Sequence, residues 1–156
     1  LIERHFDVLY NSLSSELLAG IAKQDLTLHE AMILASIVQE EVAQPDLQRT
    51  VAQVFLKRLE LDIPLGADPT FRYAAAQLGV EDSVSIDSPY NTRIYGGLPP
   101  GPIANFNLSA LEAVANPDST DWLYFVSGDD GNTYFANTEA EHQANVDTHC
   151  IELCKL

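Results

Sequence analysis

The chain has 156 residues, of which 46% are hydrophobic and 20% charged, a composition typical of a folded globular domain. Eight Lys and Arg residues stand against 23 Asp and Glu residues, so the net charge is −15. Proteins that bind nucleic-acid phosphates or anionic lipid surfaces need a basic face, which this composition does not favour. From the length we expect a single domain. From the charge we expect a neutral or polymeric substrate and no nucleic-acid partner.

The sequence contains no segment that could cross a membrane. Its longest apolar run, Ala31–Val38, is interrupted only by Ser36 and is far shorter than the roughly 20 residues that a bilayer requires. The first residue is Leu1 rather than methionine. We therefore expect that the chain begins inside a longer precursor and that any membrane anchor lies upstream of it.

The two cysteines, Cys150 and Cys154, lie near the end of the chain. In a helix, their spacing suits a disulfide poorly because the Cβ directions diverge. A zinc site would need two more ligands, and neither His142 nor His149 completes a known metal-binding spacing. We therefore interpret both cysteines as incidental residues and expect no metal.

Hydrophobic periodicity predicts helices in the first half of the chain. Apolar residues at steps of three and four predict one amphipathic helix over 1–23. Thr27 and Glu30 form a capping-box pattern ahead of a helix over about 28–43, which is apolar nearly all round and therefore belongs in the core. Two more helices are expected, over about 45–61 and from Pro69 through Leu78.

The second half of the chain is less regular. Residues 79–107 are rich in glycine and proline and show little pattern, and long loops of this kind in small domains are usually functional. The fold class expected from the whole pattern is α+β, mostly helical with one small antiparallel sheet. The elements expected after the loop are a helix over 108–115, a β-hairpin of 121–127 and 132–136, and a last helix opened by a capping box of Thr138 and Glu141.

Glu41 is the most informative residue of the sequence. On a helix it shares a face with Leu34 and Ile37, whereas Glu40 can turn to solvent. Burial and the negative end of the helix dipole should both raise the pKa of such a carboxyl group. A glutamic acid that stays protonated near neutral pH can donate a proton in catalysis. The alternative is a helix-end glutamate that reaches water or an arginine such as Arg49 or Arg58.

Three other segments contain candidate substrate-binding groups. Asp68 could supply a second carboxylate, although aspartate before proline is also a common helix N-cap. Ser88–Thr92 combines hydroxyls, an amide and an aromatic ring, a mixture that binds sugars but also serves turns. The rigid segment Leu98–Ile103 either lines a groove or is a stiff connector. We interpret His142 on the last helix as a surface histidine.

Several segments occur in an order that resembles a known family. Together they resemble the catalytic domain of the endolytic murein transglycosylases, the MltG or YceG-like family, over about residues 28–146. Glu41 corresponds to the catalytic glutamate of that family, while Gln39 and Lys57 replace its usual glutamate and asparagine. The segments are Ala35–Glu41, Val54–Leu59, Ala67–Thr70, Ser88–Thr92, Gly97–Asn105, Tyr124–Val126 and Glu141–His142.

The resemblance implies a lysozyme-like catalytic domain that acts on peptidoglycan glycan strands. Such enzymes are lyases that cut the β-1,4 bond between N-acetylmuramic acid and N-acetylglucosamine inside the strand, and they leave 1,6-anhydromuramyl ends. The resemblance implies Glu41 as the catalytic residue and no cofactor. The expected substrate-binding residues are Gln39, Asp68, Thr70, Tyr90, Asn91, Thr92 and Asn105.

The resemblance also implies an upstream membrane anchor and a LysM-like module, a location on the outer side of the cell membrane, and wall-synthesis and elongation proteins as partners. Two other functions are open. A hydrolytic muramidase would pair Glu41 with a second carboxylate, for which Asp68 is the best candidate. An inactive glycan-binding or scaffold domain would have no use for a desolvated acid.

Overall fold

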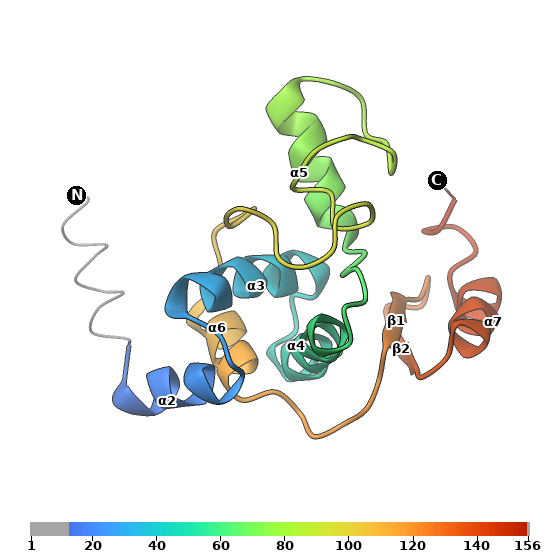
Figure 1. Ribbon diagram of the computed structural model, residues 1–156. Helices are drawn as coiled ribbons and strands as arrows, with labels where there is room; N and C mark the ends of the chain where they lie inside the picture. Colours follow the sequence, from blue (N-terminus) through green and yellow to red (C-terminus); the bar gives the residue numbers. More distant parts are fainter. Residues whose placement is uncertain (1–12, 156) are drawn as a thin grey trace.

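The core of the molecule surrounds the helix α3 (Leu28–Glu41) in the computed structural model, which describes residues 13–155. The side chains of Leu34, Ile37 and Val38 are completely buried. Four helices pack against α3: α2 (Ser15–Lys23), α4 (Pro45–Glu60), α5 (Asp68–Leu78) and α6 (Leu108–Ala115). Figure 1 shows α5 on one side of the molecule and a hairpin with α7 (Glu139–His149) on another. The class is α+β, as the sequence predicts.

The predicted capping box begins α3. The Glu30 carboxylate accepts the backbone N–H of Thr27 at 2.8 Å, and the Thr27 hydroxyl accepts the backbone N–H of Glu30 at 3.3 Å. The helix ends at Glu41, two residues before the predicted end, because Val42 takes an extended conformation and is buried in the core. Glu41 is therefore the last helical residue.

Among the described residues, the first helix begins later than the sequence predicts. Residues 1–12 lie outside the described part of the chain. Beyond them, the prediction of continuous helix is wrong at residues 13 and 14, since α2 begins at Ser15. The Ser14 hydroxyl accepts the backbone N–H of Leu17 at 3.0 Å and thereby caps the helix. A Cβ atom at Gly20 would lie 2.8 Å from the Ala115 carbonyl oxygen, so glycine permits the close approach of α2 to α6.

The helices α4 and α5 occur where they were expected, with small differences at their ends. The helix α4 ends at Glu60, and α5 begins at Asp68 with Ala67 as its N-cap. Within the described chain, residues 80–107 form no helix or strand, as predicted. No helix among residues 13–155 is long and apolar enough to pass through a bilayer.

The predicted hairpin forms a two-stranded antiparallel sheet. The strands are β1 (Tyr124–Ser127) and β2 (Thr133–Ala136), with Phe125 opposite Phe135. The helix α7 (Glu139–His149) follows the predicted capping box and packs against both strands. These elements cover the side of α4 that faces away from α2 (Figure 1).

The structure corrects the interpretation of the two cysteines, because Cys150 and Cys154 form a disulfide bond. The helical spacing argument fails because α7 ends at His149, so neither cysteine belongs to a continuing helix. The non-helical backbone brings their Cα atoms to 5.4 Å, which is compatible with a disulfide. The Asp129 carboxylate holds this last segment through three backbone N–H groups, those of Ile151, Glu152 and Leu153.

Candidate active site

A cleft with a volume of about 690 Å³ lies where the end of α3 meets the start of α5 and the hairpin. Glu41 and Asp68, the two carboxylates singled out in the sequence, both line it. The opposite wall comes from β1 and α7 and includes Tyr124 and His142. The fold therefore brings together residues that are about 100 positions apart in the sequence.

Glu41 has the environment that the helical pattern predicts. It is half-buried at the end of α3, while its neighbour Glu40 is exposed. The pKa of Glu41 is raised to about 7, chiefly by burial and secondly by the Asp68 carboxylate. Three guanidinium groups oppose these effects and lower the pKa of Glu41, those of Arg93, Arg72 and Arg58. The raised pKa favours the protonated form of Glu41 near neutral pH, the form that a general acid requires.

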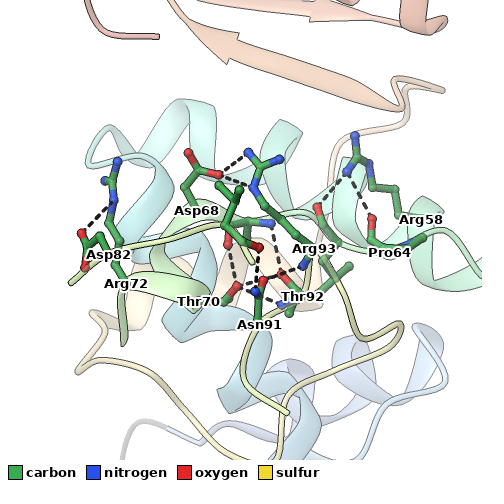
Figure 2. Close-up of polar contacts among 12 residues, drawn as sticks. Arg58, Pro64, Asp68, Thr70, Arg72, Asp82, Asn91, Thr92 and Arg93 are labelled. Atoms are coloured by element: carbon green, nitrogen blue, oxygen red, sulfur yellow. Dashed lines mark hydrogen bonds and ion pairs between the residues drawn. The ribbon is translucent and has the colours of Figure 1, made fainter. Parts of the chain in front are cut away.

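Asp68 does not act as a helix cap, in contrast to the capping alternative. It is the first residue of α5, and its Oδ1 atom accepts a hydrogen bond from Nε of Arg93 at 2.8 Å and a second from the Nη2 atom of the same guanidinium group. Figure 2 shows this two-bond ion pair between the start of α5 and the loop that follows it. The carboxylate is thus directed into the cleft rather than at the backbone of its own helix.

A buried junction of two threonines lies beneath this ion pair (Figure 2). The Thr70 hydroxyl donates to the Ala67 carbonyl at 2.5 Å and accepts the backbone N–H of Thr92 at 3.2 Å. The Thr92 hydroxyl accepts the backbone N–H of Ala67 at 3.1 Å, and the two hydroxyls are 2.9 Å apart. Because the Thr70 proton is used on Ala67, Thr92 is the donor between the hydroxyls. The junction ties the start of α5 to the loop.

Asn91 organises the same loop from within. Its amide nitrogen donates to the carbonyls of Val84 and Ile86, both at 2.9 Å, and its amide oxygen accepts the backbone N–H of Arg93 at 3.1 Å. Asn91, Thr92 and Thr70 are all buried, with exposed fractions of 0–1%. Their polar groups bind protein atoms and hold the loop, and the expected contact of these three side chains with the substrate stays a prediction.

Three other residues that were expected to bind substrate, Gln39, Tyr90 and Asn105, do not line this cleft. The Gln39 side chain accepts the backbone N–H of Asn107 at 3.1 Å. The Tyr90 ring packs on Tyr73 with 4.8 Å between ring centres, and Asn105 is exposed. Their substrate contacts stay predictions.

The rigid segment around Pro100 serves as a connector to α3. The Ser36 hydroxyl accepts the backbone N–H of Ile103 at 3.0 Å and donates to the Ile33 carbonyl at 2.7 Å. This bonding also explains why a serine interrupts the apolar run of α3. Lys57, the second departure from the family pattern, lies outside the cleft lining and binds Glu60 at 2.9 Å.

Three arginines line the cleft, and the sequence reasoning named neither Arg72 nor Arg93. Arg93 directly follows the Tyr-Asn-Thr motif, and this position is the signal that could have indicated it. Arg58 was considered only as a partner that would neutralise Glu41. Its guanidinium group instead donates to the carbonyls of Leu123 and Leu65, both at 2.7 Å, and lies 4.9 Å from the centre of the Tyr124 ring. Arg58 thereby joins α4 to the hairpin and to the segment before α5.

The interpretation of His142 as a surface residue is wrong. His142 is half-buried, lines the cleft and stacks on Tyr124 with 5.4 Å between ring centres. Its Nδ1 atom is buried and has no hydrogen-bond partner among the described residues. Burial is also the largest cause of a lowered pKa for His142. His142 therefore contributes an imidazole ring that burial keeps neutral to the α7 side of the cleft.

The fold and the site define an α+β domain with one desolvated glutamic acid in an open cleft, and comparison with known proteins agrees with this description. The model of the YceG-like family matches residues 2–148, so the chain belongs to the YceG-like family. A crystal structure of a yceG-like protein from Listeria monocytogenes superposes with a TM-score of 0.71 at 37% identity, covering 80% of this chain and 42% of that one.

Two curated relatives are named endolytic murein transglycosylase. The protein from Bacillus subtilis (strain 168) is 40% identical over 123 residues, which is 77% of this chain. The protein from Streptococcus pneumoniae serotype 2 is 36% identical over 138 residues, or 83% of this chain. The matched region spans 34% and 25% of the lengths of these relatives.

Proposed function

We propose that this chain is the catalytic domain of a lytic transglycosylase that cuts peptidoglycan glycan strands internally. The bond cleaved is the β-1,4 linkage between N-acetylmuramic acid and N-acetylglucosamine, and the product carries a 1,6-anhydromuramyl end. The observation that carries this proposal is the position of Glu41, half-buried in the cleft with a pKa raised to about 7. The names of the relatives support the choice of murein as the substrate.

The first step is proton donation by Glu41. The protonated carboxyl gives its proton to the glycosidic oxygen, so the bond from that oxygen to the muramyl C1 breaks and the leaving sugar departs as an alcohol. A raised pKa favours this step because it keeps the acid protonated near neutral pH. Positive charge then develops at C1 and its ring oxygen.

The second step uses the carboxylate that the first step leaves behind. Glu41 now accepts the proton of the muramyl C6 hydroxyl, whose oxygen forms a bond to C1 and closes the anhydro ring. Glu41 is restored to its protonated form, and water is not consumed. An internal hydroxyl has a high effective concentration, so it competes well with solvent.

Asp68 is poorly suited to the rival hydrolytic mechanism. In a retaining hydrolase the second carboxylate must attack C1, and in an inverting one it must activate water. One oxygen of Asp68 already accepts two hydrogen bonds from the Arg93 guanidinium group. The lyase therefore fits better, because it requires a single free carboxyl group.

Digestion of purified sacculi in ¹⁸O-water tests the proposal. We expect products that carry only anhydro ends, without incorporated label, and no products from Glu41→Gln. Labelled reducing ends would establish a hydrolase instead. If the folded wild-type chain leaves the sacculi undigested, the domain is instead a glycan-binding or scaffold domain.

We further propose that the domain works on the outer side of the cell membrane. Murein lies outside this membrane, and the Cys150–Cys154 disulfide suits an oxidising compartment. Protease treatment of intact spheroplasts tests this location, since an outer domain is degraded and an inner one is protected. The upstream anchor, the LysM-like module and the wall-synthesis partners stay predictions from the family resemblance.

A further inference from the structure

The cleft holds an unusual share of the positive charge of a strongly acidic chain. Only eight Lys and Arg residues are present in a chain of net charge −15, yet three arginines line the cleft that contains Glu41. Several charged or titratable groups face this cleft from the elements around it. They are Glu40 from α3, Arg58 from α4, Asp68 and Arg72 from α5, Arg93 from the loop, and Glu139 and His142 from α7.

Two of these arginines are bound to groups other than Asp68. Arg58 donates to backbone carbonyls, including those of Leu123 and Leu65. Arg72 lies 3.9 Å from the carboxylate of Asp82, in a pair whose side chains are both more than half exposed. Arg93 differs from them because its partner, Asp68, is a cleft residue itself. Asp68 and Arg93 thus form a matched pair of opposite charges beside Glu41.

The places of both charges depend on the same buried junction. Asp68 directly follows Ala67, whose N–H and carbonyl bind the hydroxyls of Thr92 and Thr70 respectively. Arg93 directly follows Thr92, and its own N–H binds the Asn91 side chain. A surface ion pair is usually mobile and weak, whereas here the backbone of each partner is fixed by buried hydrogen bonds.

We propose that Asp68 and Arg93 are positioning residues for Glu41, an ion pair that holds one negative and one positive charge beside the catalytic acid and so balances its proton affinity. The inference rests on the proposed catalytic function of Glu41. Asp68 favours the protonated acid that the first step needs, and Arg93 favours the carboxylate that the second step needs. The pair keeps both forms accessible, as a group that serves as acid and then as base requires.

Direct titration of Glu41 tests this inference without using activity. The chain is labelled with ¹³C at the glutamate side-chain carboxyl, and the Glu41 resonance is assigned as the one that Glu41→Gln removes. We expect Asp68→Asn to shift the titration midpoint of Glu41 to lower pH and Arg93→Gln to shift it to higher pH. Arg93→Lys, which keeps the charge, should restore a midpoint close to that of the wild type.

The matched control is a second ion pair of similar exposure, Arg49 with Asp118 at 3.2 Å, which lies outside the cleft lining. Arg49→Gln and Asp118→Asn should leave the midpoint unchanged, because neither residue lines the cleft or is among the charges that act on Glu41. The pH profile of kcat/KM should shift to lower pH in Asp68→Asn and to higher pH in Arg93→Gln, as the titration midpoint of the Glu41 resonance does.

The inference is overturned if the titration midpoint of Glu41 in the folded variants does not change. It is also overturned if the midpoint moves in the same direction in Asp68→Asn and Arg93→Gln. If Asp68→Asn or Arg93→Gln fails to fold, that residue is changed conservatively instead, to Asp68→Glu or Arg93→Lys. The charge of its partner is removed in the same chain, and Glu41 is titrated in this double variant. An active Glu41→Gln would end the proposed function but would leave the titration result standing, so the two failures are distinguishable.

Discussion

Glu41 and Asp68 enter one cleft from opposite ends of two helices, Glu41 as the last residue of α3 and Asp68 as the first residue of α5. The carboxyl end of a helix is negative and disfavours a carboxylate, whereas the amino end favours one. Burial adds to the effect on Glu41, and the guanidinium group of Arg93 binds Asp68. The two carboxyl groups therefore differ in role: Glu41 is the proposed proton donor, and Asp68 pairs with Arg93.

Replacing Glu41 with glutamine should abolish glycan cleavage and preserve the fold. The amide keeps the shape of the side chain but has no proton to transfer, and general acid–base catalysis contributes about 10²–10⁴-fold to the rate. Turnover of sacculi per folded molecule measures the loss. Glu40→Gln is the matched control, since this exposed neighbour should retain most of the activity. Equal losses in both variants would contradict the assignment.

Stability should fall as the pH rises through the range in which Glu41 titrates. Its pKa is about 7 in the folded chain and near 4.5 when unfolded, so between these values the folded state binds more protons. The free energy of unfolding therefore decreases with rising pH over this interval. Glu41→Gln lacks this contribution. Thermal midpoints measured at pH 4 and pH 8 should show the variant gaining stability relative to the wild type at the higher pH.

Asn91→Ala should lower stability more than it lowers the activity of each folded molecule. The substitution removes two part-buried hydrogen bonds to the carbonyls of Val84 and Ile86, each of which contributes about 0.5–1.5 kcal/mol. Denaturant unfolding and turnover on the same preparation separate the two effects. An unchanged free energy of unfolding with lost turnover would instead indicate direct contact between Asn91 and the substrate.

Thr70→Val tests the junction beneath the ion pair. Valine has the shape of threonine but leaves the Thr92 N–H and hydroxyl without their acceptor, so we expect a loss of about 1–3 kcal/mol in unfolding free energy. The Ala67 carbonyl still accepts the backbone N–H of residue 70 at 3.1 Å. Thr50→Val is the control, because this partly buried hydroxyl binds only the Asp118 carboxylate at 2.7 Å and lies outside the cleft. Similar losses in the two variants would argue against a special role for the junction.

The cysteines should resist alkylation until a reductant is added. In the folded chain Cys150 and Cys154 are joined, so neither has a thiol to react. Mass spectrometry after treatment with iodoacetamide should show no adduct on the untreated chain and adducts at both positions after reduction. Adducts without reduction would show that the disulfide does not form in the isolated protein.

Local sequence rules predicted most of the helices and the hairpin, because the interactions that define them lie within a few residues. The Thr27–Glu30 and Thr138–Glu141 capping boxes mark the helix starts that the structure shows. The apolar face of α3 indicated the desolvation of Glu41 for the same reason, since helical spacing alone brings its neighbours together. Loop residues gave weaker signals, and Ser88–Thr92 equally suited a turn or a sugar-binding surface.

Only the tertiary structure decided how this loop is held. Burial of Thr70 and Thr92 arises from contacts between segments 22 residues apart, which no local pattern specifies. The pairing of Asp68 with Arg93 and the place of His142 in the cleft depend on such long-range packing as well. By itself the sequence determined the helices and the acid at the end of α3, since both depend on neighbours within a turn or two. The charges around that acid come from four other parts of the chain, and folding alone brings them together.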